Sequence, residues 1–155
     1  MKTVLVSVDG SDASRAAVRW CADNVTPDDR ILAVSGLGPV GEFVLEFPGF
    51  DSTSPRQLRE TFRHRWCAPL DHAGLHWEPL FLNQRQGVAL ARIVQRESPD
   101  LVVLGKPEHL GVDLLLHGLV QHALHRAGCP VVLVPAPPSQ RGRRALNDDV
   151  LEDAP

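Results

Sequence analysis

The sequence contains few cysteines, and no motif connects them. Cys21, Cys67 and Cys129 are an odd number, lie far apart and include no Cys-x-x-Cys pair. This spacing argues against a disulfide framework and against a zinc site built from thiolates. We expect instead three free thiols that are buried in a core, in a protein of the reducing cytoplasm.

Long apolar runs and an excess of positive charge are also missing. The apolar run after Lys2 meets Asp9 too early to form the core of a signal peptide. No later run approaches the ~18 apolar residues that a membrane helix needs. The net charge of −3, from 16 Lys and Arg against 19 Asp and Glu, provides no broad positive field. We therefore expect a soluble cytoplasmic protein without a nucleic-acid or membrane partner.

The chain does have enough apolar residues for one core, with 43% hydrophobic content in 155 residues. Short apolar runs bounded by turn residues predict strands. Pro79 assigns the third run to a sheet edge, because proline cannot donate a ladder hydrogen bond. The five predicted strands are Thr3–Val8, Ile31–Ser35, His76–Leu82, Leu101–Leu104 and Val131–Val134.

The segments between these runs place apolar residues at helical spacing. In the first, Ala13, Ala16, Ala17 and Trp20 predict the buried face, and Ser11 or Asp12 the N-cap. Three more helices are expected from Ser54 to Gly74, with a bend or end at Pro69, from Gly87 to Glu97, and from Leu115 to Ala127. Five strands alternating with four helices predict a three-layer α/β fold with a doubly wound, mostly parallel sheet. Any ligand should lie at the carboxyl ends of the strands, near the switch point.

Two segments have a composition that differs from the rest. Residues 36–53 are rich in Gly and Pro and predict a long loop. Gly36–Gly41 has the letters of a dinucleotide fingerprint, but no helix begins inside it, so we do not expect that function. Residues 136–155 predict a flexible tail after a domain that spans residues 1–135.

Two segments together resemble the universal stress protein family. Val6–Ala17 is similar to the opening strand, Val-Asp-Gly-Ser turn and first helix of that family, and Asp100–Pro135 to its last two strands and the Leu-rich helix between them. The resemblance covers residues 1–135 and implies a sheet of order 3-2-1-4-5. It also implies a stress-response role, with adenine nucleotide bound by some members.

The nucleotide-binding members of that family carry the pattern G-x2-G-x9-G-[ST]. Glycines in such a loop let backbone N–H groups approach phosphate, and the hydroxyl adds a donor. Gly105 and Gly118 match the first and third glycines, but Glu108 replaces the second and Leu119 replaces the Ser or Thr. A carboxylate repels phosphate and an isobutyl group donates nothing, so the resemblance implies weak or absent ATP binding.

The remaining candidates form a vestigial nucleotide pocket. Asp9 either lies near an adenosine, as the resemblance implies, or closes the Asp-Gly-Ser turn with its own hydrogen bonds. Val34 is a candidate wall for adenine, and Lys106 a replacement for lost phosphate donors. The candidate cofactor-binding residues are Asp9, Val34, Gly105, Lys106 and Gly118.

No catalytic or metal site is expected. Ser7, Ser11 and Ser14 lack a nucleophile elbow, and no ligand set surrounds the histidines between His109 and His125. We expect a non-catalytic stress-response or regulatory module that acts with an unidentified protein partner. The alternative is an ATP-binding switch or slow ATPase. A homodimer is expected through the last strand, at Val131, Val132, Leu133 and Val134.

Overall fold

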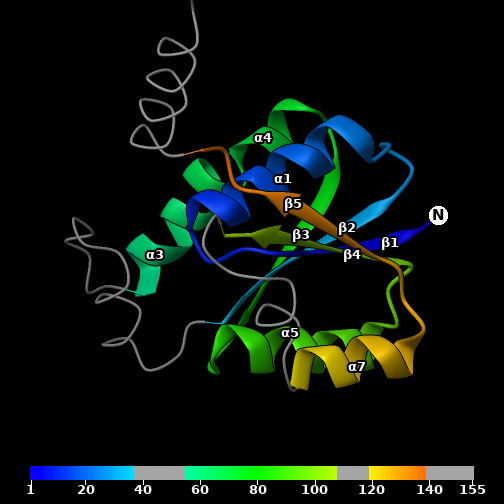
Figure 1. Cartoon of the computed structure of the whole chain (residues 1–155). Coiled ribbons are helices and arrows are strands. Elements are labelled where there is room, and N and C mark those ends of the chain that lie inside the picture. The colour runs from blue at the N-terminus through cyan, green and yellow to red at the C-terminus, as the bar shows by residue number, and fades with distance from the viewer. Residues whose placement is uncertain (37–54, 108–118, 139–155) are drawn as a thin grey trace, which may run out of the picture.

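The computed structural model describes residues 1–36, 55–107 and 119–138 (Figure 1). Three of the expectations above lie outside these ranges. They are the long loop of residues 36–53 beyond Gly36, the segment that holds Glu108 and Gly118, and the tail beyond residue 138.

Five parallel strands form one sheet in the order β3-β2-β1-β4-β5, as predicted. The central strand β1 is apolar on both faces because helices cover both of its sides (Figure 1). Pro79 lies on the edge strand β3, opposite Ala33 of β2, so the predicted edge position is confirmed. The strands are β1 Thr3–Ser7, β2 Arg30–Gly36, β3 His76–Leu82, β4 Leu101–Lys106 and β5 Val131–Pro135.

Helices cover the two faces of the sheet and enclose a core on each (Figure 1). One face carries α1 Asp12–Asn24 and the segments α3 Pro55–Thr61, η1 Phe62–Trp66 and α4 Ala68–His72. The other face carries α5 Gln86–Glu97 and α7 Leu119–Ala127. Strand β1 serves both cores, because Val4 and Val6 point to the first and Leu5 to the second. No helix in the described ranges is both long enough and apolar enough to cross a membrane.

Helix α1 begins where the sequence predicted, but its buried face is rotated. The Ser11 Oγ caps the helix by accepting a hydrogen bond from the Ser14 N–H at 3.2 Å. Ala13 and Ala17 are buried as expected, whereas Ala16 and Trp20 are only half-buried. Small residues at several positions satisfied the helical spacing equally well. The residues of α1 that become buried are those on the side of the helix that packs against β4.

The second crossover is not one helix. It consists of α3 Pro55–Thr61, the π-helical turn η1 Phe62–Trp66 and α4 Ala68–His72. The interruption at Cys67 comes two residues before Pro69, in agreement with the expected bend, because proline has no N–H and crowds the preceding turn. The π-helical turn was not predicted. It directs Phe62 and Trp66 into the core beneath α1.

The aromatic residues of this crossover form a cluster against the sheet. The Phe62 ring centroid lies 4.8 Å from that of Phe81 and 6.3 Å from that of Trp66, both in edge arrangements. Trp66 is buried and belongs to the core on the α1 side of the sheet. The guanidinium groups of Arg59 and Arg63 lie over the rings of Phe81 and Trp77, each 5.7 Å from the centroid.

All three cysteines are free thiols, but they are not equally buried. Burial raises the pKa of Cys21 and of Cys67 to about 12, which keeps both thiols protonated and unreactive. Cys129 is only half-buried, contrary to the expectation of three buried thiols, because it lies in the exposed connection between α7 and β5. Partial burial, with a smaller effect of Asp100, raises the pKa of the Cys129 thiol.

Candidate functional site

A cavity of about 180 Å³ lies where β1 and β4 end, at the point where the strand order reverses. This is the place where the sequence predicted that any ligand would lie. Strand β1 and the start of α1 contribute hydroxyl and carboxylate groups, and α5 and the end of β4 contribute the opposite wall. The lining residues are Ser7, Asp9, Ser11, Ser14, Gln86, Gly87, Leu90, Leu104, Gly105 and Pro107.

Asp9 organises the turn between β1 and α1. Its Oδ1 accepts hydrogen bonds from the Ser11 N–H at 2.9 Å and from the Ser11 Oγ at 2.6 Å. The Asp9 N–H donates to the Ser14 Oγ at 3.3 Å, and that hydroxyl donates to the Ser11 carbonyl at 3.1 Å. The turn chemistry proposed for Asp9 is therefore present. Asp9 is also one of the residues that line the cavity.

Gly10 is required by both its backbone conformation and its surroundings. Its φ is +84°, a region that residues with a Cβ rarely adopt. A Cβ at this position would also overlap the indole ring of Trp66, which packs against the turn. The aromatic cluster of the second crossover thus closes one side of the Asp9 turn.

Gly105 is explained by packing without any ligand. A Cβ at Gly105 would overlap the carbonyl group of Ala13 and lie 2.7 Å from the Ser14 nitrogen. Strand β4 can approach the first turn of α1 this closely only with glycine at this position. The retained first glycine of the motif is therefore no evidence for phosphate binding.

Val34 and Lys106 do not join Asp9 and Gly105 in the cavity wall. The Val34 side chain is fully buried in the core on the α5 side of the sheet. Its carbonyl accepts hydrogen bonds from the Val8 N–H and the Gln86 Nε2, both at 2.9 Å. Lys106 ends β4, is half-exposed and is not among the lining residues. Gly118 lies outside the described residues.

Gln86 is a site residue that the sequence reasoning missed. It is the first residue of α5, whereas the predicted helix began at Gly87. Its carboxamide makes three hydrogen bonds across the ends of β1 and β2, to Ser7, Val34 and Gly36. Glutamine near a helix start is commonplace, so nothing in the sequence distinguished this one. The contacts depend on strands that are 50 or more residues away.

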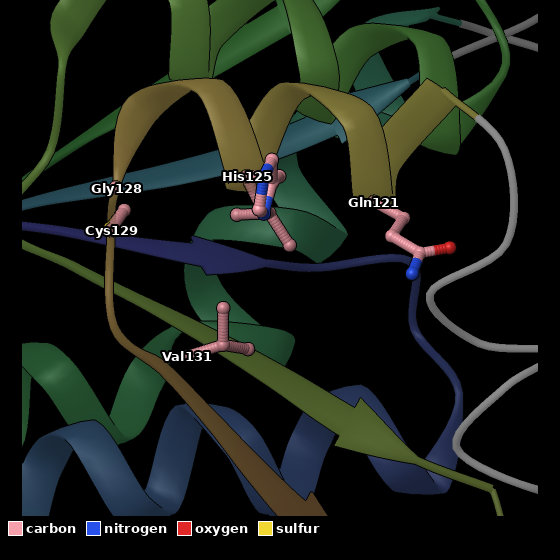
Figure 2. Close-up of a pocket in the computed structure, with 6 residues that line it drawn as sticks. Gln121, His125, Gly128, Cys129 and Val131 are labelled. Carbon is pink, nitrogen blue, oxygen red and sulfur yellow. The ribbon is translucent and has the colours of Figure 1, made fainter.

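A second cavity, of about 290 Å³, lies at the other end of the sheet between α7 and the start of β5 (Figure 2). Gln121 and His125 project from α7 on the side of Val131, and Cys129 lies in the connection (Figure 2). The Cys129 thiol donates a weak hydrogen bond to the Pro130 carbonyl at 3.4 Å. No three His, Cys, Asp or Glu side chains in the described ranges gather closely enough to hold a metal ion.

The fold and the position of the first cavity define a doubly wound α/β protein with a cavity at the switch point of its sheet. The chain belongs to the universal stress protein family, whose model matches residues 1–135. The sequence matches no curated protein.

Solved structures share this fold. A universal stress protein in complex with cAMP is 18% identical, with 88% of this chain and 98% of the other covered and a TM-score of 0.57. A universal stress protein family protein from Arabidopsis thaliana with AMP bound is 19% identical, with 90% and 98% covered and a TM-score of 0.56. A universal stress protein from Archaeoglobus fulgidus is 15% identical, with 86% and 93% covered and a TM-score of 0.54.

Proposed function

We propose that this chain is a non-catalytic stress-response or regulatory module of the cytoplasm that binds adenine nucleotide weakly or not at all. It acts as a homodimer on a protein partner. The observation that carries the nucleotide part is the cavity itself. Its volume of about 180 Å³ is below the ~300 Å³ at which small-molecule pockets usually begin, and no Lys or Arg is among its described lining residues.

The charges and donors of the cavity support this proposal. The described residues that line the cavity include no Lys or Arg, and Lys106 at the end of β4 is not among them, so no lining cation is available there for the phosphates of a nucleotide. The hydroxyls of Ser11 and Ser14 already take part in the turn. In the sequence, Glu108 and Leu119 stand where phosphate-binding members have glycine and a hydroxyl.

The lack of a catalytic set among the described residues supports a non-catalytic role. The Ser7 Oγ accepts a hydrogen bond from the Gln86 Nε2, and no hydroxyl of the cavity has a histidine partner in the described part of the chain. A serine needs an adjacent base to act as a nucleophile. The alternative function is an ATP-binding switch or slow ATPase, and its nucleotide-binding part is supported by the two structural relatives that hold cAMP and AMP.

Titration calorimetry with ATP and Mg²⁺ separates the two functions. We expect no binding at micromolar concentrations by the natural chain. The double variant Glu108→Gly with Leu119→Ser should gain at least tenfold in affinity, because it restores bare backbone and a hydroxyl donor. Glu60→Gln, on the exposed face of α3, is the matched charge control and should change nothing.

A micromolar dissociation constant for the natural chain, about −8 kcal/mol, would contradict the proposal. The chain would then be a working nucleotide receptor. The same samples, incubated with ATP and assayed for released phosphate, test the ATPase alternative directly.

The dimer part of the proposal is supported by the free edge of β5. This strand pairs with β4 on one side, and within the described residues no strand pairs with its other side. Its residues Val131 to Val134 are half-buried and apolar, and an apolar edge with free N–H and C=O groups favours pairing with a second copy. Sedimentation velocity should show a dimer at micromolar concentration. A monomer over the whole concentration range would refute this part alone.

A further inference from the structure

Nearly all the hydrogen-bonding capacity of the Gln86 carboxamide is satisfied within the protein. Its Nε2 donates to the Ser7 Oγ at 2.8 Å and to the Val34 carbonyl at 2.9 Å, and its Oε1 accepts from the Gly36 N–H at 2.6 Å. Both N–H donors and one acceptor of the carboxamide are therefore satisfied. The side chain also lines the cavity and is half-buried, so it separates the end of β2 from the cavity.

The end of β2 presents a carbonyl acceptor and an N–H donor side by side. The carboxamide matches this pair because it carries a donor and an acceptor in one plane. An adenine edge carries the same combination, an amino donor beside a ring-nitrogen acceptor. A carboxamide and an adenine edge can therefore bind the same pair of groups, one carbonyl and one N–H. The pair formed by the Val34 carbonyl and the Gly36 N–H therefore suits either group.

The backbone around Gly36 leaves little freedom for a different arrangement. A Cβ at Gly36 would lie 2.7 Å from the backbone nitrogen of Gln86 and would overlap the backbone carbonyl of Gln84. The start of α5 thus covers one side of Gly36, while the carboxamide covers its N–H. Removal of the carboxamide would expose the hydrogen-bonding pair and enlarge the cavity beside it.

We propose that the Gln86 carboxamide is an internal substitute for a purine edge, which occupies a base-binding position at the end of β2 and excludes the base from the cavity. This inference rests on the proposed function, because it names the residue that decides whether the cavity admits a base. It concerns the base only and is independent of Glu108 and Leu119, which concern the phosphates. Gln86 is thus a specificity-determining residue.

The decisive experiment uses adenosine, which has no phosphate. In Gln86→Ala, titration calorimetry should show at least a tenfold gain in adenosine affinity over the natural chain. Purine riboside, which differs from adenosine by the missing amino group, should show no comparable gain because it cannot donate to the Val34 carbonyl. Gln95→Ala, on the exposed side of the same helix, is the matched control and should behave as the natural chain does.

The opposite result would mean that the Gln86 side chain only stabilises the fold through its hydrogen bonds. If Gln86→Ala lowers the melting temperature without any gain in adenosine affinity, or if purine riboside gains equally, the proposal is wrong. Should the alanine variant not fold, Gln86→Ser provides a shorter side chain that suits a helix start, and the same gain is expected. If the natural chain binds no ATP and Gln86→Ala gains no adenosine affinity, this inference is refuted and the proposed function is left standing.

Discussion

Replacement of Gly105 by alanine is expected to destabilise the protein by about 3 kcal/mol, the upper part of the range for overpacked sites. The added methyl group would overlap the carbonyl group of Ala13. Both partners of this contact are backbone, one in β4 and one in the first turn of α1, so no flexible side chain can move aside. Either the strand or the helix must shift, and both belong to the core of the molecule.

Urea unfolding followed by circular dichroism measures this effect, with Gly74→Ala as the control. Gly74 also lacks a Cβ, but a Cβ there would meet nothing within 4 Å in the described structure. Its φ of +68° alone should cost about 1 kcal/mol. If Gly105→Ala is no worse than Gly74→Ala, close packing does not explain Gly105, and a ligand-binding reason for this glycine regains weight.

Phe62→Ala is expected to cost 3 to 5 kcal/mol, about the range for large aromatic truncations in cores. Phe62 is 1% exposed and contacts the rings of Trp66 and Phe81 in edge arrangements. Its loss leaves a void between the π-helical turn and the sheet. Thermal unfolding should show the loss, whereas Val88→Ala, at a side chain that is 38% exposed, should stay within about 0.5 kcal/mol.

The same substitution should also disturb the candidate site. Trp66 depends on Phe62 for part of its packing and lies against Gly10, which belongs to the turn that Asp9 organises. Broadened or shifted amide signals of Gly10 and Ser11 in a folded Phe62→Ala sample would show this connection. Unchanged signals would mean that the turn is held by its own hydrogen bonds alone.

The strands could be predicted because each is a short apolar run bounded by turn residues. β1 and β4 are buried on both faces, and such runs need no partner to be recognised. The position of β3 at the sheet edge could also be predicted, because Pro79 lacks an N–H whatever surrounds it and cannot donate a ladder hydrogen bond. The rotation of α1 and the π-helical turn could not be predicted, because several packings satisfy the same spacing of small and aromatic residues.

The parts of the candidate site that depend on contacts between neighbouring residues could be predicted from the sequence. The parts that depend on contacts between distant residues could not. Asp9 and Ser11 are two residues apart, so their turn follows from sequence. Gly105 was identified from a resemblance, but the reason for it lies in a contact with Ala13, more than 90 residues away. Val34 was a candidate wall for adenine, and the hydrogen bonds that its carbonyl accepts from Val8 and Gln86 could not be predicted, because they join distant segments.

The sequence by itself determined the α/β class, the edge position of β3 and the mismatch of the phosphate loop, because these depend on residue type and short-range spacing. Only the tertiary structure decided that Gly105 serves helix packing and that Gln86 fills the end of β2. A hydrogen bond or a close backbone contact depends on where two distant segments come to lie. That position is set by the packing of the whole sheet and not by the residues around either partner.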